Sequence, residues 1–204
     1  MDIINRSLKN PVSGQAQQTN ILVLACQDAR VPFALIPIAE ALGIDGGKAQ
    51  IVRGPGAWLE HKDKNNNAHL AALEVAVKGE KVKHIAVMGH TDCRAVRTYL
   101  TGKDTMPGTM ALLAPLKDAR AAVEKQSDNV DTRAYLLEQE SVRQNLKNLR
   151  SYDFVREAEQ AGHLKLHGWV LDIETRCLHV LDEETGVFRA PSPDMIKRVE
   201  KQHG

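Results

Sequence analysis

The chain has 204 residues, which is the length of one domain. Its composition, with 43% hydrophobic and 26% charged residues, is that of an ordinary globular protein and excludes a wholly disordered chain. Lys and Arg number 27 against 26 Asp and Glu, giving a formal charge of +1, and aromatic residues make up 4%. This composition lacks both the basic excess and the base-stacking aromatic side chains of a nucleic-acid binder, so we expect no nucleic-acid partner.

No apolar run approaches the roughly 18–20 residues that cross a bilayer, so no membrane partner is expected. Residues 1–19 are polar and lack the apolar core of a secretory signal, which predicts a cytoplasmic protein. We interpret residues 1–19 as an N-terminal arm and residues 20–204 as a single domain.

Apolar runs alternate along the chain with segments of helical periodicity that Gly or Pro residues end. The predicted strands are, in chain order, residues 21–25, 49–52, 84–88, 164–173 and 177–181. The predicted helices are residues 33–42, 68–77, 94–100, 110–125, 132–149, 154–161 and 195–202. Because strands alternate with helices, the fold class is predicted to be α/β, with a central, mostly parallel sheet flanked by helices.

Two predicted strands end at residues that bind metals. Cys26 follows the first strand, and His90 and Cys93 follow the third. Ligands of open α/β sheets bind outside the carboxyl ends of the strands, so neighbouring parallel strands would bring these three residues together. Two sulfurs and one imidazole suit zinc, and three protein ligands leave one tetrahedral position, as in catalytic zinc sites.

Asp28 and Arg30 follow Cys26 at alternate positions. In an extended segment the three side chains point to the same side. A carboxylate beside a guanidinium forms a bidentate pair, which keeps Asp28 ionised. Asp28 is thus a candidate either to fill the fourth position of a metal or to guard it. Asp92, between His90 and Cys93, is a candidate to orient the ligands.

The segments Cys26-x-Asp28-x-Arg30 and His90-x-x-Cys93 together resemble the signature of the β-class carbonic anhydrases. The resemblance covers residues from about 20 to 182 in the same order. Further similar segments are residues 82–90, 142–149 and 162–170.

The resemblance implies that Cys26, His90 and Cys93 hold a catalytic zinc ion in a mostly parallel α/β fold. It implies the reversible hydration of CO₂ to bicarbonate through attack by zinc-bound hydroxide. Asp28 would either bind zinc in an inactive closed form or turn away to pair with Arg30. The family also implies a homodimer or a higher homo-oligomer.

Some positions depart from the family pattern. Ala29 stands where the family commonly has Ser, and Arg94-Ala95 where it has Gly-Gly after the second Cys. The segment Gly54, Pro55 and Gly56 replaces a common Asn-Ala-Gly, and we expect it to form a backbone wall of the substrate pocket together with Arg94.

These departures keep two alternatives open. The first is a carbonyl sulfide or carbon disulfide hydrolase, since some relatives with the same ligands act on these linear substrates. The second is a catalytically silent zinc- or bicarbonate-binding protein, in which Asp28 stays on the metal as a fourth ligand. Retention of Arg30 argues against the second alternative, because a structural site has no need of an arginine that draws its ligand away.

Overall fold

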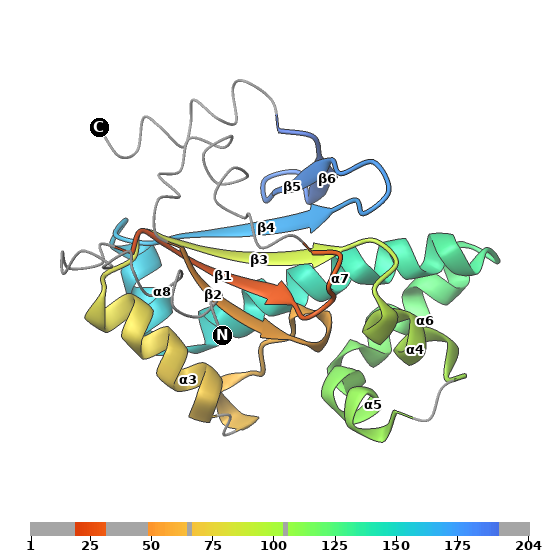
Figure 1. Cartoon of the computed structure of the whole chain (residues 1–204), viewed down its shortest axis with the longest axis horizontal. Coiled ribbons are helices and arrows are strands. Elements are labelled where there is room, and N and C mark those ends of the chain that lie inside the picture. The colour runs from red at the N-terminus through yellow and green to blue at the C-terminus, as the bar shows by residue number, and fades with distance from the viewer. Residues whose placement is uncertain (1–18, 32–48, 65–66, 104–105, 192–204) are drawn as a thin grey trace, which may run out of the picture.

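The computed structural model describes residues 19–31, 49–64, 67–103 and 106–191. These residues form a six-stranded sheet in the order β2-β1-β3-β4-β5-β6 (Figure 1). The first four strands in this order are parallel to one another, whereas β5 pairs antiparallel with β4, and β6 antiparallel with β5. The strands are β1 Ile21–Cys26, β2 Ala49–Gly54, β3 His84–His90, β4 Lys165–Leu171, β5 Leu178–Asp182 and β6 Val187–Arg189. The predicted α/β class with a mostly parallel sheet is confirmed.

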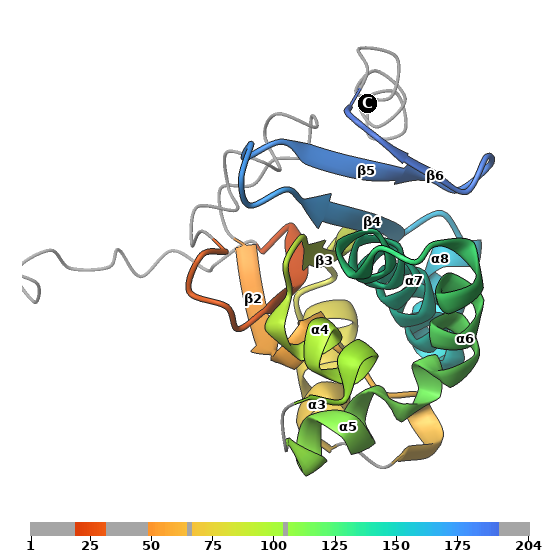
Figure 2. The same ribbon diagram turned by 90° about the vertical axis from the view of Figure 1, so that its right-hand side faces the viewer.

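The described helices gather beside the sheet and beyond the carboxyl ends of its central strands (Figures 1 and 2). The longest, α7, packs on β3 and β4, while α4, α5 and α6 lie past the ends of β1 and β3. The helices are α3 Asn67–Glu74, α4 Arg94–Thr101, α5 Pro107–Leu113, α6 Lys117–Gln126, α7 Val130–Ser151 and α8 Asp153–Gln160.

All six residues of β1 are buried, as a strand in the middle of a parallel sheet requires. Its alternate side chains enter two different cores. Leu22 and Leu24 belong to the core that includes residues of α7 and α8, whereas Val23 and Ala25 belong to the core that includes residues of α4, α5 and α6. The strand is therefore held from both faces, which fixes the position of the loop that follows it.

Glycines in β3 and β4 let α7 approach the sheet closely. A Cβ added at Gly89 would lie 2.8 Å from Val142 Cγ2, which is closer than a Cβ atom normally lies to any other heavy atom. A Cβ added at Gly168 would lie 3.1 Å from Val142 Cγ1. Because Gly89 directly precedes His90, this contact places α7 against the carboxyl end of β3.

One predicted helix is wrong as a single element. Residues 110–125 are divided between α5 and α6, with a short 3₁₀ turn at Ala114–Leu116 between them. Pro115 explains the break, because its ring clashes with the preceding turn and it lacks the N–H of a helical hydrogen bond.

Other differences lie at the ends of elements and in one short strand. The strand predicted at residues 164–173 is shorter, and β6 was not predicted because only Phe188 of its three residues is buried. The helices predicted at residues 33–42 and 195–202 lie outside the described residues, as does the N-terminal arm except for residue 19. The domain boundaries therefore stay a prediction.

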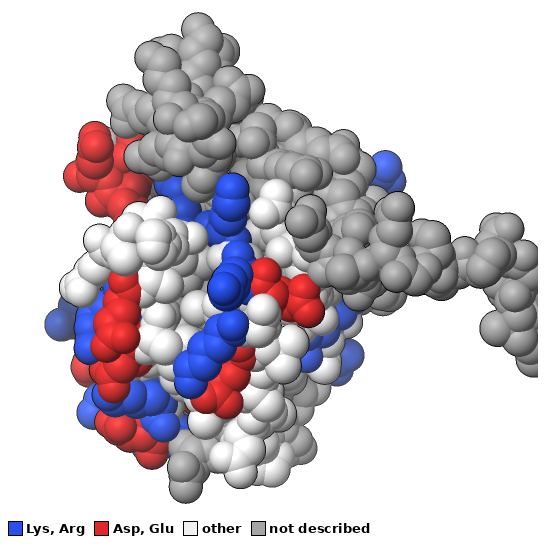
Figure 3. Space-filling model, turned by 90° about the vertical axis from the view of Figure 1, so that its left-hand side faces the viewer, with Lys and Arg blue, Asp and Glu red and all other residues white. Residues whose placement is uncertain are grey.

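On the face shown in Figure 3, Lys and Arg side chains are interspersed with Asp and Glu side chains and uncharged residues. The charge of that face is therefore mixed rather than of one sign. Among the described residues, no helix has both the length and the apolar character needed to cross a membrane.

We expect Gly89→Ala to lower the free energy of unfolding by about 1–3 kcal/mol, because the new methyl group overpacks the contact with Val142. Urea denaturation checks this. Gly108→Ala is the control, since a Cβ there meets no atom within 4 Å. In a chain that carries both Gly89→Ala and Val142→Ala, the loss of unfolding free energy should be smaller than the sum of the losses of the two single variants, because the smaller side chain relieves the close contact. A loss equal to that sum would contradict the close-contact explanation.

Candidate metal centre

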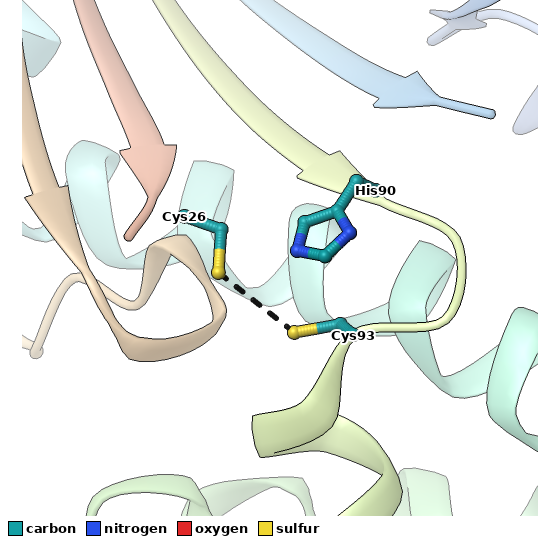
Figure 4. Close-up of side chains that lie close together, drawn as sticks. All are labelled: Cys26, His90 and Cys93. Atoms are coloured by element: carbon teal, nitrogen blue, oxygen red, sulfur yellow. Dashed lines mark hydrogen bonds between the residues drawn. The ribbon is translucent and has the colours of Figure 1, made fainter. Parts of the chain in front are cut away.

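Three buried donor residues converge at the carboxyl ends of β1 and β3. Cys26 is the last residue of β1 and His90 the last of β3, and a two-residue turn leads from His90 to Cys93, the N-cap residue of α4. The three side chains point toward one another (Figure 4), and their ligand atoms all lie within 4.8 Å of one another. The group could therefore hold a metal ion.

The imidazole of His90 is oriented by the backbone. Its Nδ1 lies 2.9 Å from the carbonyl oxygen of Thr91, and because a carbonyl only accepts, Nδ1 donates this hydrogen bond. In the neutral ring the lone pair is then on Nε2, which is buried and lies beside the two sulfurs. Metal-binding histidines are typically arranged in this way.

The two sulfurs form a proton-sharing pair. Cys26 Sγ and Cys93 Sγ lie 3.9 Å apart, and this hydrogen bond is the main cause that lowers the pKa of Cys26. The same bond, together with burial, raises the pKa of Cys93. A cysteine that binds a metal does so as a thiolate, and the lowered pKa of Cys26 favours that form. Two sulfurs and one imidazole nitrogen are a donor set that fits a borderline-soft divalent ion.

Asp28 is held by Arg30 beside these donors. Arg30 donates to Asp28 Oδ1 from Nε at 3.1 Å and to Oδ2 from Nη2 at 2.8 Å, which is a bidentate pair. The pair lowers the pKa of Asp28 to about 2, so the carboxyl is ionised. Asp28 Oδ2 lies 4.0 Å from His90 Nε2, which places a negative charge at the edge of the donor group.

Arg30 also joins the two loops that carry the donors. Its Nη1 donates to Asp92 Oδ2 at 2.7 Å and its Nη2 to the carbonyl oxygen of Asp92 at 2.8 Å. Asp92 has a φ of +55°, in the left-handed region that few non-glycine residues adopt. Arg30 therefore connects the loop after β1 to the strained turn between His90 and Cys93.

The residues expected to line a substrate pocket lie close to this centre but differ in exposure. Gly54 pairs with Cys26 across β1 and β2, and its carbonyl accepts the N–H of Gln27 at 3.0 Å. Gly56 is buried, with a φ of +65° that favours glycine. Arg94 is exposed at the start of α4. Their role toward a substrate stays a prediction.

Glu138 is a residue of this region that the sequence reasoning missed. It lies on α7, is only 2% exposed, and its Oε1 accepts the backbone N–H of Cys93 at 2.8 Å. Burial raises its pKa to about 8. A cavity of about 380 Å³ lies beside it and is also lined by Arg30, Asp92 and Arg97. The one available signal was an acidic residue among the buried positions of a helix.

Comparisons with known proteins agree on one family. The sequence model of the family described as carbonic anhydrase matches residues 21–178. A carbonic anhydrase of Pseudomonas aeruginosa is 31% identical over 170 residues, which cover 81% of this chain and 74% of that protein. A carbonic anhydrase of Helicobacter pylori is 28% identical over 192 residues, which cover 89% of this chain and 84% of that protein.

Solved structures show the same likeness. The β-carbonic anhydrase CcaA has a TM-score of 0.75 and 26% identity, with 86% of this chain and 85% of that chain covered. One of two tetrameric β-carbonic anhydrases of the ascomycete Sordaria macrospora has a TM-score of 0.68 and 26% identity, with 86% and 84% covered. The family match includes both strands that carry the donor residues.

We expect the chain to bind Co²⁺ with the strong near-ultraviolet absorption of thiolate-to-metal charge transfer, because two sulfurs face one site. Cys93→Ser should weaken both the binding and the absorption. The control is Cys177→Ser, since that cysteine is exposed. A titration monitored by absorbance checks this, and equal spectra for Cys93→Ser and the unmodified chain would exclude Cys93 as a ligand.

Proposed function

The chain belongs to the β-carbonic anhydrase family, and on this premise we propose that it catalyses the reversible hydration of CO₂ to bicarbonate with a zinc ion held by Cys26, His90 and Cys93. The observation that carries the proposal is the convergence of two sulfurs and an imidazole nitrogen within 4.8 Å, beside an ionised aspartate. Three protein ligands leave one tetrahedral position for the reacting oxygen, as catalytic zinc sites require.

Zinc is the metal that this donor set supports best, because it accepts both thiolate and imidazole in tetrahedral geometry. When bound, it would supply hydroxide near neutral pH by lowering the pKa of coordinated water. The protein's part is to present the donors already assembled. Thr91 fixes the ring of His90, and the position of Cys26 is fixed by a fully buried strand.

Asp28 is proposed to orient the nucleophile. As an ionised carboxylate, Asp28 only accepts hydrogen bonds. A hydroxide that donates its hydrogen to Asp28 is therefore held with its lone pairs directed away from Asp28. Arg30 donates to Oδ1 from its backbone N–H and from Nε, but to Oδ2 only from Nη2. Oδ2, on the side of His90, therefore keeps further capacity to accept. Asp28 thus fits the task of aligning a hydroxide toward CO₂.

The silent zinc protein is the less supported alternative. It requires Asp28 to be a fourth ligand, which closes the site. In the structure both carboxylate oxygens of Asp28 accept hydrogen bonds from Arg30, and Arg30 is itself anchored on Asp92. This arrangement favours the state in which Asp28 is paired with arginine.

The chain is also proposed to act as a homo-oligomer on a small-molecule substrate. The support is the likeness to a protein whose structure is described as tetrameric, at 26% identity. The alternative substrates, carbonyl sulfide and carbon disulfide, are linear like CO₂, and exposed Arg94 beside Cys93 is one of the departures from the family pattern that keep them open.

The deciding measurement is stopped-flow CO₂ hydration by protein whose zinc content has been determined. We expect acceleration that requires bound zinc and is lost after removal with a chelator. No acceleration at full zinc loading would contradict the proposal; release of sulfide from carbonyl sulfide by the same sample would then select the hydrolase.

Asp28→Asn should retain zinc but reduce turnover by roughly 10–100-fold, the usual cost of removing a group that orients the metal centre. Asparagine keeps the size of the side chain but loses the charge that Arg30 holds. Zinc analysis and stopped-flow rates on the same preparation separate the two effects. Turnover equal to that of the unmodified chain would show that Asp28 does not orient the nucleophile.

Asp92→Asn should lower turnover by a smaller factor, about fivefold or less, because it weakens an exposed ion pair worth about 1 kcal/mol or less. The matched control is Asp131→Asn, because Asp131 and Asp92 are both exposed and both pair with Arg97, whereas only Asp92 also pairs with Arg30. Steady-state rates compare them. Equal effects of the two substitutions would mean that the anchoring of Arg30 by Asp92 has no role in turnover.

A further inference from the structure

Glu138 is the only Asp, Glu, Lys or Arg that is buried among the residues described by the structure. The other buried side chains of α7 are apolar or uncharged. Burying a carboxyl group costs free energy unless hydrogen bonds compensate it. Its presence at this place therefore calls for a local reason.

The contact of Glu138 is with the main chain of a candidate metal ligand. Oε1 accepts the N–H of Cys93 at 2.8 Å, across 45 residues of sequence. Cys93 is the N-cap of α4 and makes no capping hydrogen bond with its own side chain, which leaves its sulfur free to face Cys26. In a capping box, an acidic residue of the same helix accepts the N–H of the N-cap residue. Here the acceptor is Glu138, which belongs to a different helix, α7.

The reach of Glu138 depends on the close packing of α7 against β3. A Cβ at Gly89 would meet Val142 at 2.8 Å and the backbone oxygen of Glu138 at 3.8 Å. The residue before His90 is thus in direct contact with the turn of α7 that carries Glu138. One helix therefore touches the chain on both sides of the loop between His90 and Cys93.

That loop has a strained backbone that needs such support. Asp92 has a φ of +55°, and Cys93 follows it with an extended ψ of 116° before α4 begins. Arg30 holds the outer side of the loop through Asp92, and Glu138 holds its inner side through Cys93. Without an acceptor, the N–H of Cys93 would be buried and unpaired, and the loop could relax.

We infer that Glu138 is a positioning residue of the metal centre, which holds the main chain of Cys93 so that its sulfur faces Cys26 Sγ and His90 Nε2. This inference rests on the proposed metal site and goes beyond it, because it assigns part of the metal affinity to a helix that supplies no ligand.

The test measures metal affinity rather than activity. Zn²⁺ dissociation constants are determined by competition with a chromophoric chelator, and Co²⁺ spectra report the geometry of the sulfurs. We expect Glu138→Leu to weaken zinc binding by about 10–100-fold and to alter the charge-transfer bands. Glu138→Gln, which keeps a carbonyl acceptor, should stay within about threefold of the unmodified chain because the hydrogen bond is retained.

Asn145→Leu is the matched control. Asn145 lies on the same helix, is fully buried, and its Oδ1 accepts the N–H of Leu59 at 2.7 Å, so it makes the same kind of bond to a loop without a metal ligand. We expect this variant to be less stable to urea in the presence of a chelator, yet to bind zinc with unchanged affinity. Equal losses of affinity in Asn145→Leu and Glu138→Leu would overturn the inference in favour of general destabilisation.

Glu138→Asp is the second variant if Glu138→Leu does not fold. It keeps the carboxyl group but withdraws it by one methylene from Cys93, so we expect weaker zinc binding and an altered Co²⁺ spectrum. Affinity and spectrum equal to those of the unmodified chain would overturn the inference alone. Failure of the unmodified chain to bind either metal stoichiometrically would instead overturn the proposed function.

Discussion

The parallel pairing of β1 with β3 is the constraint on which the candidate metal centre depends. The chain leaves β1 toward β2 on one side and later returns as β3 on the other, so the connections diverge between these two strands. Ligands of α/β sheets bind at such a switch point. The register pairs Ala25 with Met88, which brings the next residues of both strands to the same edge. A slip by one residue would turn Cys26 or His90 to the opposite face.

The helix α7 transmits this order from the sheet to the loops. Its apolar residues pack on β3 and β4, where glycines allow close contact, and three of its buried polar residues each serve a loop. Asn145 accepts the N–H of Leu59 and Asn148 donates to the carbonyl of the same residue, while Glu138 accepts the N–H of Cys93. The helix thus fixes two loops without contributing a donor atom to the metal centre.

Local sequence patterns were sufficient to predict five of the six described strands and the three residues that converge at the sheet edge, because buried apolar runs show where a parallel strand ends and which residues come directly after it. The break of the helix at Pro115 was not predicted, although proline carries a backbone restriction that the sequence itself shows. Two contacts could not be predicted, that of Glu138 with Cys93 and that of Arg30 with Asp92. They join residues that are 45 and 62 positions apart in the sequence. Such pairs depend on how closely helix and sheet pack, which periodicity does not specify.

The sharing of Arg30 between two carboxylates determines how freely Asp28 can leave its place. If Asp28 turned toward a metal, Arg30 would lose the hydrogen bonds of Nε and Nη2 to Asp28 but would keep those to Asp92. The guanidinium would therefore stay where it is and continue to attract Asp28 back. Because the side chain of Arg30 is 44% exposed, water screens this attraction to about 1 kcal/mol or less. Asp92 thus holds Arg30 in place even when Asp28 moves. The state in which Asp28 is paired with Arg30 is favoured, but by a free energy small enough for Asp28 to leave it.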